Sequence, residues 1–426
     1  MAKFSHIVVV AMLALATVAF AEGGHADIAS ADALFKAGKF ADAAKVYAGI
    51  VAKDPGHHRA IVRLGELALL SNRLNEAKEW LQKAIKVNPD QRVAKALLAE
   101  VFYRQDDFPS TVPLLRAIGM GSKAEMLESF KGITPYDVRS GAESTSVKFV
   151  VGDPLPLIRV RVNGGEEVNF LIDTGAAEVI LDTDFAKEVN AKLFGSQTGT
   201  FAGGKTAAFH FGRIDSLGLG DFVIQNVPVH TLNTRRFSKP IFGGRRVDGI
   251  IGTVLFYHFL PSLDYPRRQL ILRRKSKEDL NRFVAAAHAG NAHVVSFWMS
   301  GDHYMVAWAR VEKRQPVLLF VDTGLAGGGV SLAKSVLDEA GIRPLEDQAG
   351  EGIGGGGKVK VTPFLVKELS LGDATQHNVR GLGVGGETLA RALGFRLGGI
   401  ISHGFFKPYT LTFDFTGMRL FLQKRS

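Results

Sequence analysis

The sequence Asp-Thr-Gly occurs twice in this chain of 426 residues, at 173–175 and 322–324, and the residues that follow each copy also repeat. An Ile-Ile pair begins 77 residues after the first aspartate, at Ile250, and 78 residues after the second, at Ile400. The chain is therefore expected to contain two lobes built on one plan. Each lobe would bring one carboxylate on a tight turn.

The composition is that of a globular protein, with 46% apolar and 22% charged residues. A chain of this length is expected to hold two to four domains. The net charge of +10 comes with several Arg-Arg pairs, which we interpret as solvated strand ends because no nucleic-acid motif accompanies them. The absence of cysteine excludes disulfides, thiol catalysis and cysteine-zinc sites.

Residues 1–21 have the pattern of a secretory signal peptide. Lys3 precedes an apolar run over residues 7–20, and Ala19 and Ala21 supply small side chains at the cleavage positions. The run is shorter than the roughly 20 residues that a membrane span needs. We expect an exported protein, either periplasmic or secreted, with an uncleaved N-terminal anchor as the alternative.

A repeat with a period of 34 residues occupies residues 27–119. Phe40, Leu74 and Phe108 mark equivalent positions, and the apolar residues between them have helical spacing. The pattern resembles the tetratricopeptide repeat family, with two clear repeats and a degenerate third. Each helical hairpin of such a repeat exposes an apolar face that only a neighbour can cover. The repeats are interpreted either as a groove for a protein partner or as a support for the following domain.

From residue 146 onward the apolar period becomes two, which predicts strands. The turn at Asn163-Gly164 predicts a hairpin between strands at 157–162 and 168–172. The predicted order is a signal peptide (1–21), helical repeats (27–119), a linker (120–145), a first β lobe (146–275), an inter-lobe link (276–291) with a helix beginning at Ser276, and a second β lobe (292–426).

An isolated Asp-Thr-Gly is a common turn, in which glycine permits a backbone conformation that β-branched residues resist. Here residues 173–181 resemble the active-site segment of retropepsins, the retroviral-type branch of the aspartic proteases. Residues 249–252 resemble the element that packs behind the catalytic turn, and residues 351–355 resemble the glycine-tipped flap. The resemblance covers residues 146–426, with two halves fused in one chain as in pepsin-like enzymes.

The resemblance implies a multidomain protein, with tetratricopeptide-type helices followed by two all-β retropepsin-like lobes that form a pseudo-dimer. It implies an aspartic endopeptidase with Asp173 and Asp322 as the catalytic pair and with neither a metal nor another cofactor. The implied supporting residues are Thr174, Gly175, Thr323 and Gly324. The implied flap and substrate-binding residues are Gly203, Gly204, Gly352, Ile353, Gly354 and Gly355.

The chemistry of such a pair follows from its charge. Two carboxylates about 3 Å apart cannot both ionise cheaply, so they share one proton. The charged partner can take a proton from a water molecule, while the neutral partner donates to the scissile carbonyl oxygen. Asp264 and Asp414, in the expected terminal strands, are interpreted as structural carboxylates.

Two departures from the family pattern leave alternatives open. Leu325 follows the second turn, where aspartic proteases usually carry Ala, Ser or Thr, and Ser402 stands where the first lobe has Gly252. One alternative is a non-catalytic scaffold whose degenerate lobes bind peptides. Another is a peptidase that cleaves only the partners delivered by the repeats.

The expected partners are a polypeptide substrate and a protein bound by the repeats. Nucleic acid is not an expected partner, and no membrane span is expected after signal cleavage. Because both half-sites lie in one chain, the protein is expected to act as a monomer.

Overall fold

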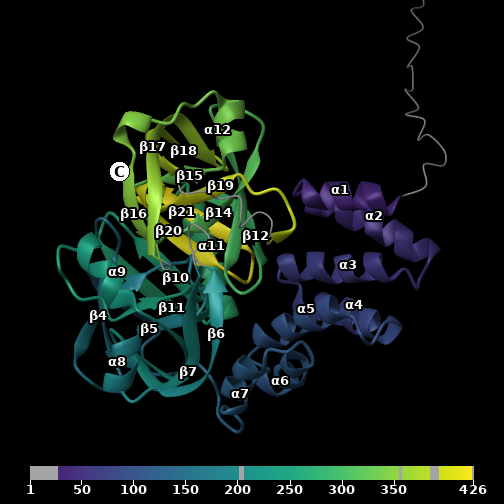
Figure 1. The fold of residues 1–426 in the computed structure, drawn as a ribbon, viewed down its shortest axis with the longest axis horizontal. Helices are drawn as coiled ribbons and strands as arrows, with labels where there is room; N and C mark the ends of the chain where they lie inside the picture. The colour runs from purple at the N-terminus through teal and green to yellow at the C-terminus, as the bar shows by residue number, and fades with distance from the viewer. Residues whose placement is uncertain (1–26, 201–205, 355–356, 384–392, 425–426) are drawn as a thin grey trace, which may run out of the picture.

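The computed structural model describes residues 27–200, 206–354, 357–383 and 393–424, and Figure 1 shows three parts. A row of helices lies beside two β lobes, which are stacked on one another. This is the predicted multidomain architecture. Within the described residues, no helix combines the length and the apolar character needed to cross a membrane.

The helical part consists of antiparallel pairs, as the 34-residue period predicted. The helices are α1 (Ile28–Lys36), α2 (Phe40–Lys53), α3 (His58–Leu70), α4 (Leu74–Val87), α5 (Arg92–Tyr103), α6 (Phe108–Ala117) and α7 (Gly121–Glu128). Small residues allow the helices to approach closely. Ala43 and Ala77 are fully buried, and a Cβ at Gly65 would come within 2.7 Å of the Leu81 side chain.

Within the residues that the structure describes, the first lobe contains ten strands and three short helices. The strands are β2 (Ser144–Val151), β3 (Leu157–Val162), β4 (Glu167–Ile172), β5 (Val179–Asp182), β6 (Lys192–Thr200), β7 (Thr206–Leu219), β8 (Phe222–Leu232), β9 (Gly249–Ile251), β10 (Phe259–Asp264) and β11 (Gln269–Arg274). The helices are α8 (Thr183–Glu188), α9 (Thr234–Ile241) and α10 (Thr253–Phe256). The predicted hairpin joins β3 to β4, and both Asn163 and Gly164 have the positive φ that its tight turn requires.

The second lobe follows the helix α11 (Lys277–Ala289), which Ser276 caps as predicted. Its strands are β12 (His293–Ser300), β13 (Tyr304–Val311), β14 (Val317–Asp322), β15 (Val330–Leu332), β16 (Gly350–Gly354), β17 (Gly357–Leu371), β18 (Ala374–Gly383), β19 (Gly399–Ser402), β20 (Tyr409–Asp414) and β21 (Arg419–Lys424). The short helices are α12 (Lys334–Ala340), the 3-10 turn η2 (Glu346–Gln348) and α14 (His403–Phe406).

The pairing of the strands repeats between the lobes. Strand β4 is parallel to β9 and β14 is parallel to β19, while β5 and β15 are antiparallel to the same partners. The terminal strands join the lobes in one sheet, in the order β2–β11–β10–β20–β21–β12. The two lobes meet at the β10–β20 pair, where Ser262 Oγ lies 2.6 Å from Thr412 Oγ1.

Asp414 of this sheet has the structural role that the sequence indicated. Its carboxylate accepts the Gly417 N–H at 2.8 Å and forms an ion pair with Arg419 at 2.7 Å. Asp264, at the equivalent position, accepts the Arg267 N–H at 3.2 Å. Both aspartates therefore stabilise the turns that follow their strands.

Residues 120–145 are not the linker that the sequence suggested. They contain α7 and strand β1 (Asp137–Arg139), which pairs with β8 of the first lobe. The Arg213 side chain of β7 also donates a hydrogen bond to the Ser129 carbonyl at the end of α7. The helical row thus continues directly into the first lobe, and its last segment is held there by strand pairing and by the Arg213 hydrogen bond.

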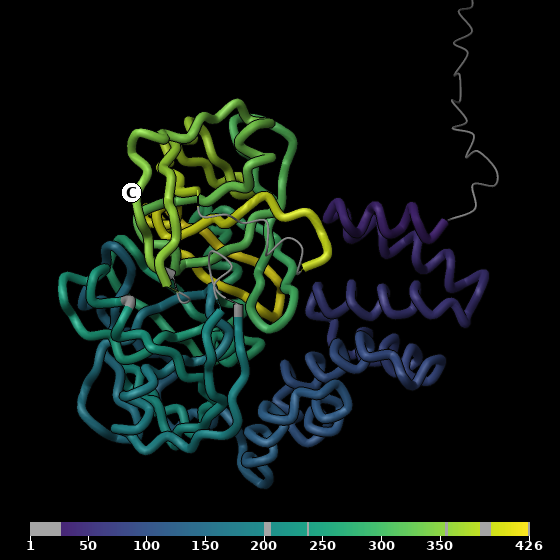
Figure 2. The backbone as a smooth tube through the Cα atoms, viewed as in Figure 1, coloured from purple at the N-terminus to yellow at the C-terminus, as the bar shows by residue number. Residues whose placement is uncertain are grey.

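The turns between the helices of each repeat pack on the second lobe. Phe40 lies 5.4 Å from Trp298 and 5.2 Å from Phe395, measured between ring centroids. In the second repeat, Asn72 Nδ2 donates to the Phe415 carbonyl at 2.9 Å. Figure 2 shows the resulting path, with α1 beside the second lobe and α7 beside the first. The described repeats are therefore docked on both lobes.

Candidate active site

Each Asp-Thr-Gly turn is presented by the end of a buried parallel strand. Strand β4 runs into Asp173, whose N–H donates to the Ile251 carbonyl of β9 at 3.1 Å. In the second lobe, β14 ends at Asp322, which is in register with Ser402 of β19. The Ile-Ile pairs that followed each turn in the sequence supply these neighbouring strands. Each aspartate thus lies where a buried apolar strand ends and the turn begins.

The two turns face each other at the boundary between the lobes, which brings the predicted pair together. The Gly175 N–H donates to Asp173 Oδ1 at 2.7 Å, and the Gly324 N–H donates to Asp322 Oδ1 at the same distance. Each carboxyl also lies against the glycine of the opposite turn, so the two carboxyl groups are close to one another. Both aspartates are half-buried, so solvent reaches a pair that protein groups otherwise surround.

The two glycines serve a purpose that differs from the one expected for an Asp-Thr-Gly turn. Neither Gly175 nor Gly324 has a positive φ. A Cβ at Gly175 would instead lie 2.6 Å from Asp322 Oδ1, and one at Gly324 would overlap the Asp173 carboxyl. Each glycine therefore leaves room for the carboxyl of the opposite lobe.

The two threonines form a reciprocal set of hydrogen bonds across the lobe boundary. The Thr174 N–H donates to Thr323 Oγ1 and the Thr323 N–H donates to Thr174 Oγ1, each at 3.0 Å. Thr174 Oγ1 also donates to the Val321 carbonyl at 3.1 Å, and Thr323 Oγ1 to the Ile172 carbonyl at 3.5 Å. Both threonines are fully buried, so these bonds fix the separation of the turns without competition from water.

We expect Thr174→Ala to lower the free energy of unfolding by about 1–3 kcal/mol, because it leaves the buried Thr323 N–H without its acceptor. Thr174→Ser keeps the hydroxyl and should retain most of the stability. Denaturant unfolding of the wild type and both variants measures the effect. Equal midpoints for Thr174→Ala and the wild type would contradict this role for the threonines.

Burial raises the pKa of both aspartates above the usual carboxyl range, and the negative charge of Asp322 raises that of Asp173 further. Because the two carboxyls lie side by side, ionisation of one disfavours ionisation of the other. The glycine N–H donors oppose the rise, most clearly at Asp322. The arrangement thus favours one neutral and one charged carboxyl, which are an acid and a base side by side.

Among the described residues, two further hydroxyl groups support the turns, and neither was predicted to do so. Thr253 Oγ1 donates to the Thr174 carbonyl at 2.9 Å. Ser402 Oγ accepts the Leu325 N–H at 3.1 Å and donates to the Asp322 carbonyl. The serine at position 402, which appeared as a departure from the pattern, therefore anchors the second turn. Thr253 lies two residues after the first Ile-Ile pair and Ser402 one residue after the second, and a hydroxyl side chain so close to each pair was the signal that could have identified them.

The predicted flaps are hairpins, one in each lobe, that extend toward the lobe boundary (Figure 1). In the second, Gly352 is paired with Val359, Ile353 with Lys358, and Gly354 with Gly357. Three of the predicted flap residues, Gly203, Gly204 and Gly355, lie outside the described residues.

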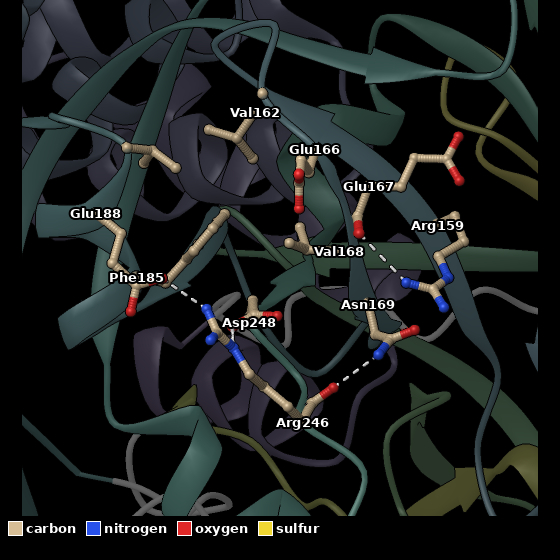
Figure 3. Close-up of a pocket in the computed structure, with 12 residues that line it drawn as sticks. Arg159, Val162, Glu166, Glu167, Val168, Asn169, Phe185, Glu188, Arg246 and Asp248 are labelled. Atoms are coloured by element: carbon tan, nitrogen blue, oxygen red, sulfur yellow. Dashed lines mark hydrogen bonds and ion pairs between the residues drawn. The ribbon is translucent and has the colours of Figure 1, made fainter.

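A separate surface cavity of about 500 Å³ lies in the first lobe (Figure 3). It contains no residue of either Asp-Thr-Gly turn. Arg246 at its edge is paired with Glu188 at 2.6 Å, and Asn169 Nδ2 donates to the Arg246 carbonyl at 2.8 Å. Hydrogen bonds from Arg235 and Arg246 lower the pKa of Glu188. These basic side chains therefore have acidic partners in the protein, and the cavity is not part of the candidate active site.

Comparisons with known families agree with this geometry. The model of the aspartyl protease family matches residues 158–255 and 307–395, one segment in each lobe. The tetratricopeptide repeat model matches residues 34–101. No curated protein matches the chain. The matches confirm the architecture indicated by the sequence, with helical repeats followed by two segments of the aspartyl protease type.

Proposed function

We propose that this protein, whose two lobes match the aspartyl protease family, is an exported aspartic-type endopeptidase. The observation that carries the proposal is the close approach of Asp173 and Asp322, which lie on turns held together by reciprocal threonine hydrogen bonds across the lobes. The N-terminal pattern of a signal peptide supports export to the periplasm or the medium.

In the proposed mechanism the pair hydrolyses a peptide bond with one water molecule. The charged carboxylate of the pair takes a proton from the water as the water attacks the scissile carbonyl carbon. The neutral carboxyl of the pair donates its proton to the carbonyl oxygen, so charge does not build up on that oxygen. The carboxyl that was protonated by the water then donates its proton to the leaving nitrogen, while the other carboxylate takes a proton from one hydroxyl of the tetrahedral diol. The C–N bond breaks, the amine and the carboxylic acid are released, and the pair again holds one proton.

Both half-sites come from one chain, which supports action as a monomer on a polypeptide substrate. The turns of the described repeats are occupied by the second lobe, so a protein partner would use another face of the helices. Recruitment of a partner or substrate by that face remains part of the proposal.

The main alternative is a scaffold that binds peptides without cutting them, and the feature favouring it is Leu325 beside the second turn. The deciding experiment incubates the mature protein with a denatured protein mixture over a pH series, beside Asp173→Asn and Asp322→Asn. Fragments produced by the wild type alone support the peptidase. Peptide binding by all three proteins without fragments supports the scaffold.

We expect the activity to peak at weakly acidic or near-neutral pH. Activity needs one proton on the pair, so it falls below the first pKa of the pair and above the second. Burial raises both values, and mutual repulsion raises the second further, so the active window moves to higher pH. A pH profile of kcat measures this window, and an optimum at about pH 2, as in the strongly acid-active proteases, would contradict it.

The same reasoning predicts the effect of Ala176→Ser. Ala176 is buried beside the first turn and offers no hydrogen-bond donor from its side chain. A hydroxyl there can donate to the Asp173 carboxylate, which favours the charged form and lowers the first pKa. The acidic limb of the profile should therefore move to lower pH. A folded variant with an unchanged acidic limb would show that the hydroxyl does not reach the pair.

A further inference from the structure

Glu178 is a fully buried acidic residue five positions after Asp173, and the proposed chemistry does not use it. The backbone beside it is held from within the first lobe. The Val254 N–H donates to the Ala177 carbonyl at 2.9 Å, and a Cβ at Gly252 would overlap the carbonyls of Ala177 and Glu178. The position of Glu178 is therefore tied to that of the turn that carries Asp173.

Two tyrosines from outside the first aspartyl protease segment hold the Glu178 carboxyl. Tyr103 Oη donates to Oε1, and Tyr136 Oη donates to Oε2 at 3.1 Å. Tyr103 is the last residue of α5, in the helical repeats, and its ring stacks on Phe108 at 5.6 Å. Tyr136 precedes β1 and is also buried. The repeats thus reach the active-site loop through a buried hydrogen bond.

Arg104, which directly follows Tyr103 at the end of α5, binds the second lobe. Arg104 Nη2 donates to the Met299 carbonyl at 3.0 Å and to the Gly301 carbonyl, both in the hairpin between β12 and β13. Arg104 is itself fixed by Glu100 at 2.8 Å. Adjacent residues at the end of α5 therefore bind the two lobes separately, one through the Glu178 side chain and the other through backbone carbonyls.

The first lobe alone has this anchor. Five residues after Asp322 the chain has Gly327, at the start of three consecutive glycines, so the second turn offers no carboxyl for such a contact. Ser402 instead secures the second turn from within its own lobe. The first turn therefore has, in addition to Thr253 from its own lobe, a contact with the repeats at a position where the second turn has no side chain.

We propose that Tyr103 is a positioning residue, which holds Glu178 and thereby sets Asp173 against Asp322, so that the repeats form part of the catalytic unit. This proposal rests on the proposed peptidase function. Tyr103 does not touch the reacting groups. Its effect passes through Glu178 and the backbone of residues 173–178.

The test compares full-length Tyr103→Phe with Tyr47→Phe. Tyr47 is a matched control, because its hydroxyl also donates to a buried carboxylate, Asp32 Oδ1 at 2.6 Å, but within the first repeat. We expect Tyr103→Phe to lower kcat roughly 10- to 100-fold on a short peptide, with KM unchanged, because small misplacements of catalytic groups have effects of this order. Tyr47→Phe should retain the wild-type kcat.

Two readouts keep this result separate from a failure of the peptidase proposal. Hydrogen exchange of the amides in residues 173–178 should be faster in Tyr103→Phe than in Tyr47→Phe, whether or not a substrate is cleaved. Wild type no more active than Asp173→Asn would overturn the peptidase function. An active Tyr103→Phe with wild-type kcat and wild-type exchange in this turn would overturn the positioning role alone.

A second pair of variants decides the matter if Tyr103→Phe does not fold. Glu178→Gln keeps a side chain of the same shape that can bond to both tyrosines, and should retain kcat and slow exchange. Glu178→Ala removes the carboxyl that the tyrosines hold, so we expect a lower kcat and faster exchange in residues 173–178. Equal kcat and equal exchange in these two variants would overturn the proposal.

Discussion

Replacing either aspartate of the pair with asparagine should reduce kcat/KM by at least about 10²- to 10⁴-fold, the range that positioned acid–base groups supply. Asparagine has nearly the same shape, but it can neither share the proton nor accept one from water. Because Asp173 and Asp322 act as one pair, each single substitution should be as damaging as the double substitution. Steady-state cleavage of a peptide or denatured protein measures the loss.

The fold of both asparagine variants should be intact. Removing a carboxyl whose pKa is raised by burial takes away a desolvation penalty, so the unfolding midpoint should stay constant or rise. Asp90→Asn, at an exposed position in the repeats, is the matched control and should leave cleavage unchanged. Near wild-type cleavage by either Asp173→Asn or Asp322→Asn would mean that the lobes do not form a joint site.

Gly324→Ala should reduce activity on the order of 10²-fold, which is the effect of a catalytic group displaced by about 1 Å. The added methyl group would overlap the Asp173 carboxyl, so the two turns must move apart. Gly175→Ala should act in the same way, because its Cβ would lie 2.6 Å from Asp322 Oδ1. Cleavage assays with circular dichroism and unfolding curves separate a displaced pair from an unfolded protein.

Gly141→Ala provides the control for the glycine substitutions. Gly141 has no atom within 4 Å of the added Cβ and does not have a positive φ, so alanine should be tolerated there. If Gly324→Ala cleaves as fast as Gly141→Ala, the turns do not need the close approach seen in the structure.

The sequence predicted those features whose cause lies within a few residues or in the internal repeat. The Asn163-Gly164 hairpin is an example, since its turn geometry is a property of the two residues themselves. The repeated spacing from aspartate to Ile-Ile likewise predicted two lobes of one plan. It also predicted that Asp173 and Asp322 would meet, because β4 and β14 have the same place in the two lobes and both end at the lobe boundary.

The features that the sequence did not reveal depend on contacts between distant segments. Glycine is needed at position 324 because the Asp173 carboxyl of the other lobe occupies the space that a Cβ would take. The hydrogen bond from Tyr103 to Glu178 joins residues 75 positions apart and has no periodic pattern. The segment 120–145 had the composition of a linker, yet it pairs with the first lobe because Val138 and Tyr136 are positioned by strand β8 and by Glu178.

The two lobes belong to one chain and are joined through β10 and β20, which has a consequence for how the amino-acid sequences of the two halves of the candidate site can change. In a site built from two identical subunits, every substitution is copied onto both sides of the two-fold axis. Here a substitution alters one half of the site only. The two halves already differ in sequence, since Glu178 follows the first aspartate by five residues and Gly327 follows the second by five. One half of the candidate site can therefore keep its contact with the helical repeats while the other half changes independently. In the proposed peptidase, the residues on the two sides of the cleaved bond would then contact different side chains.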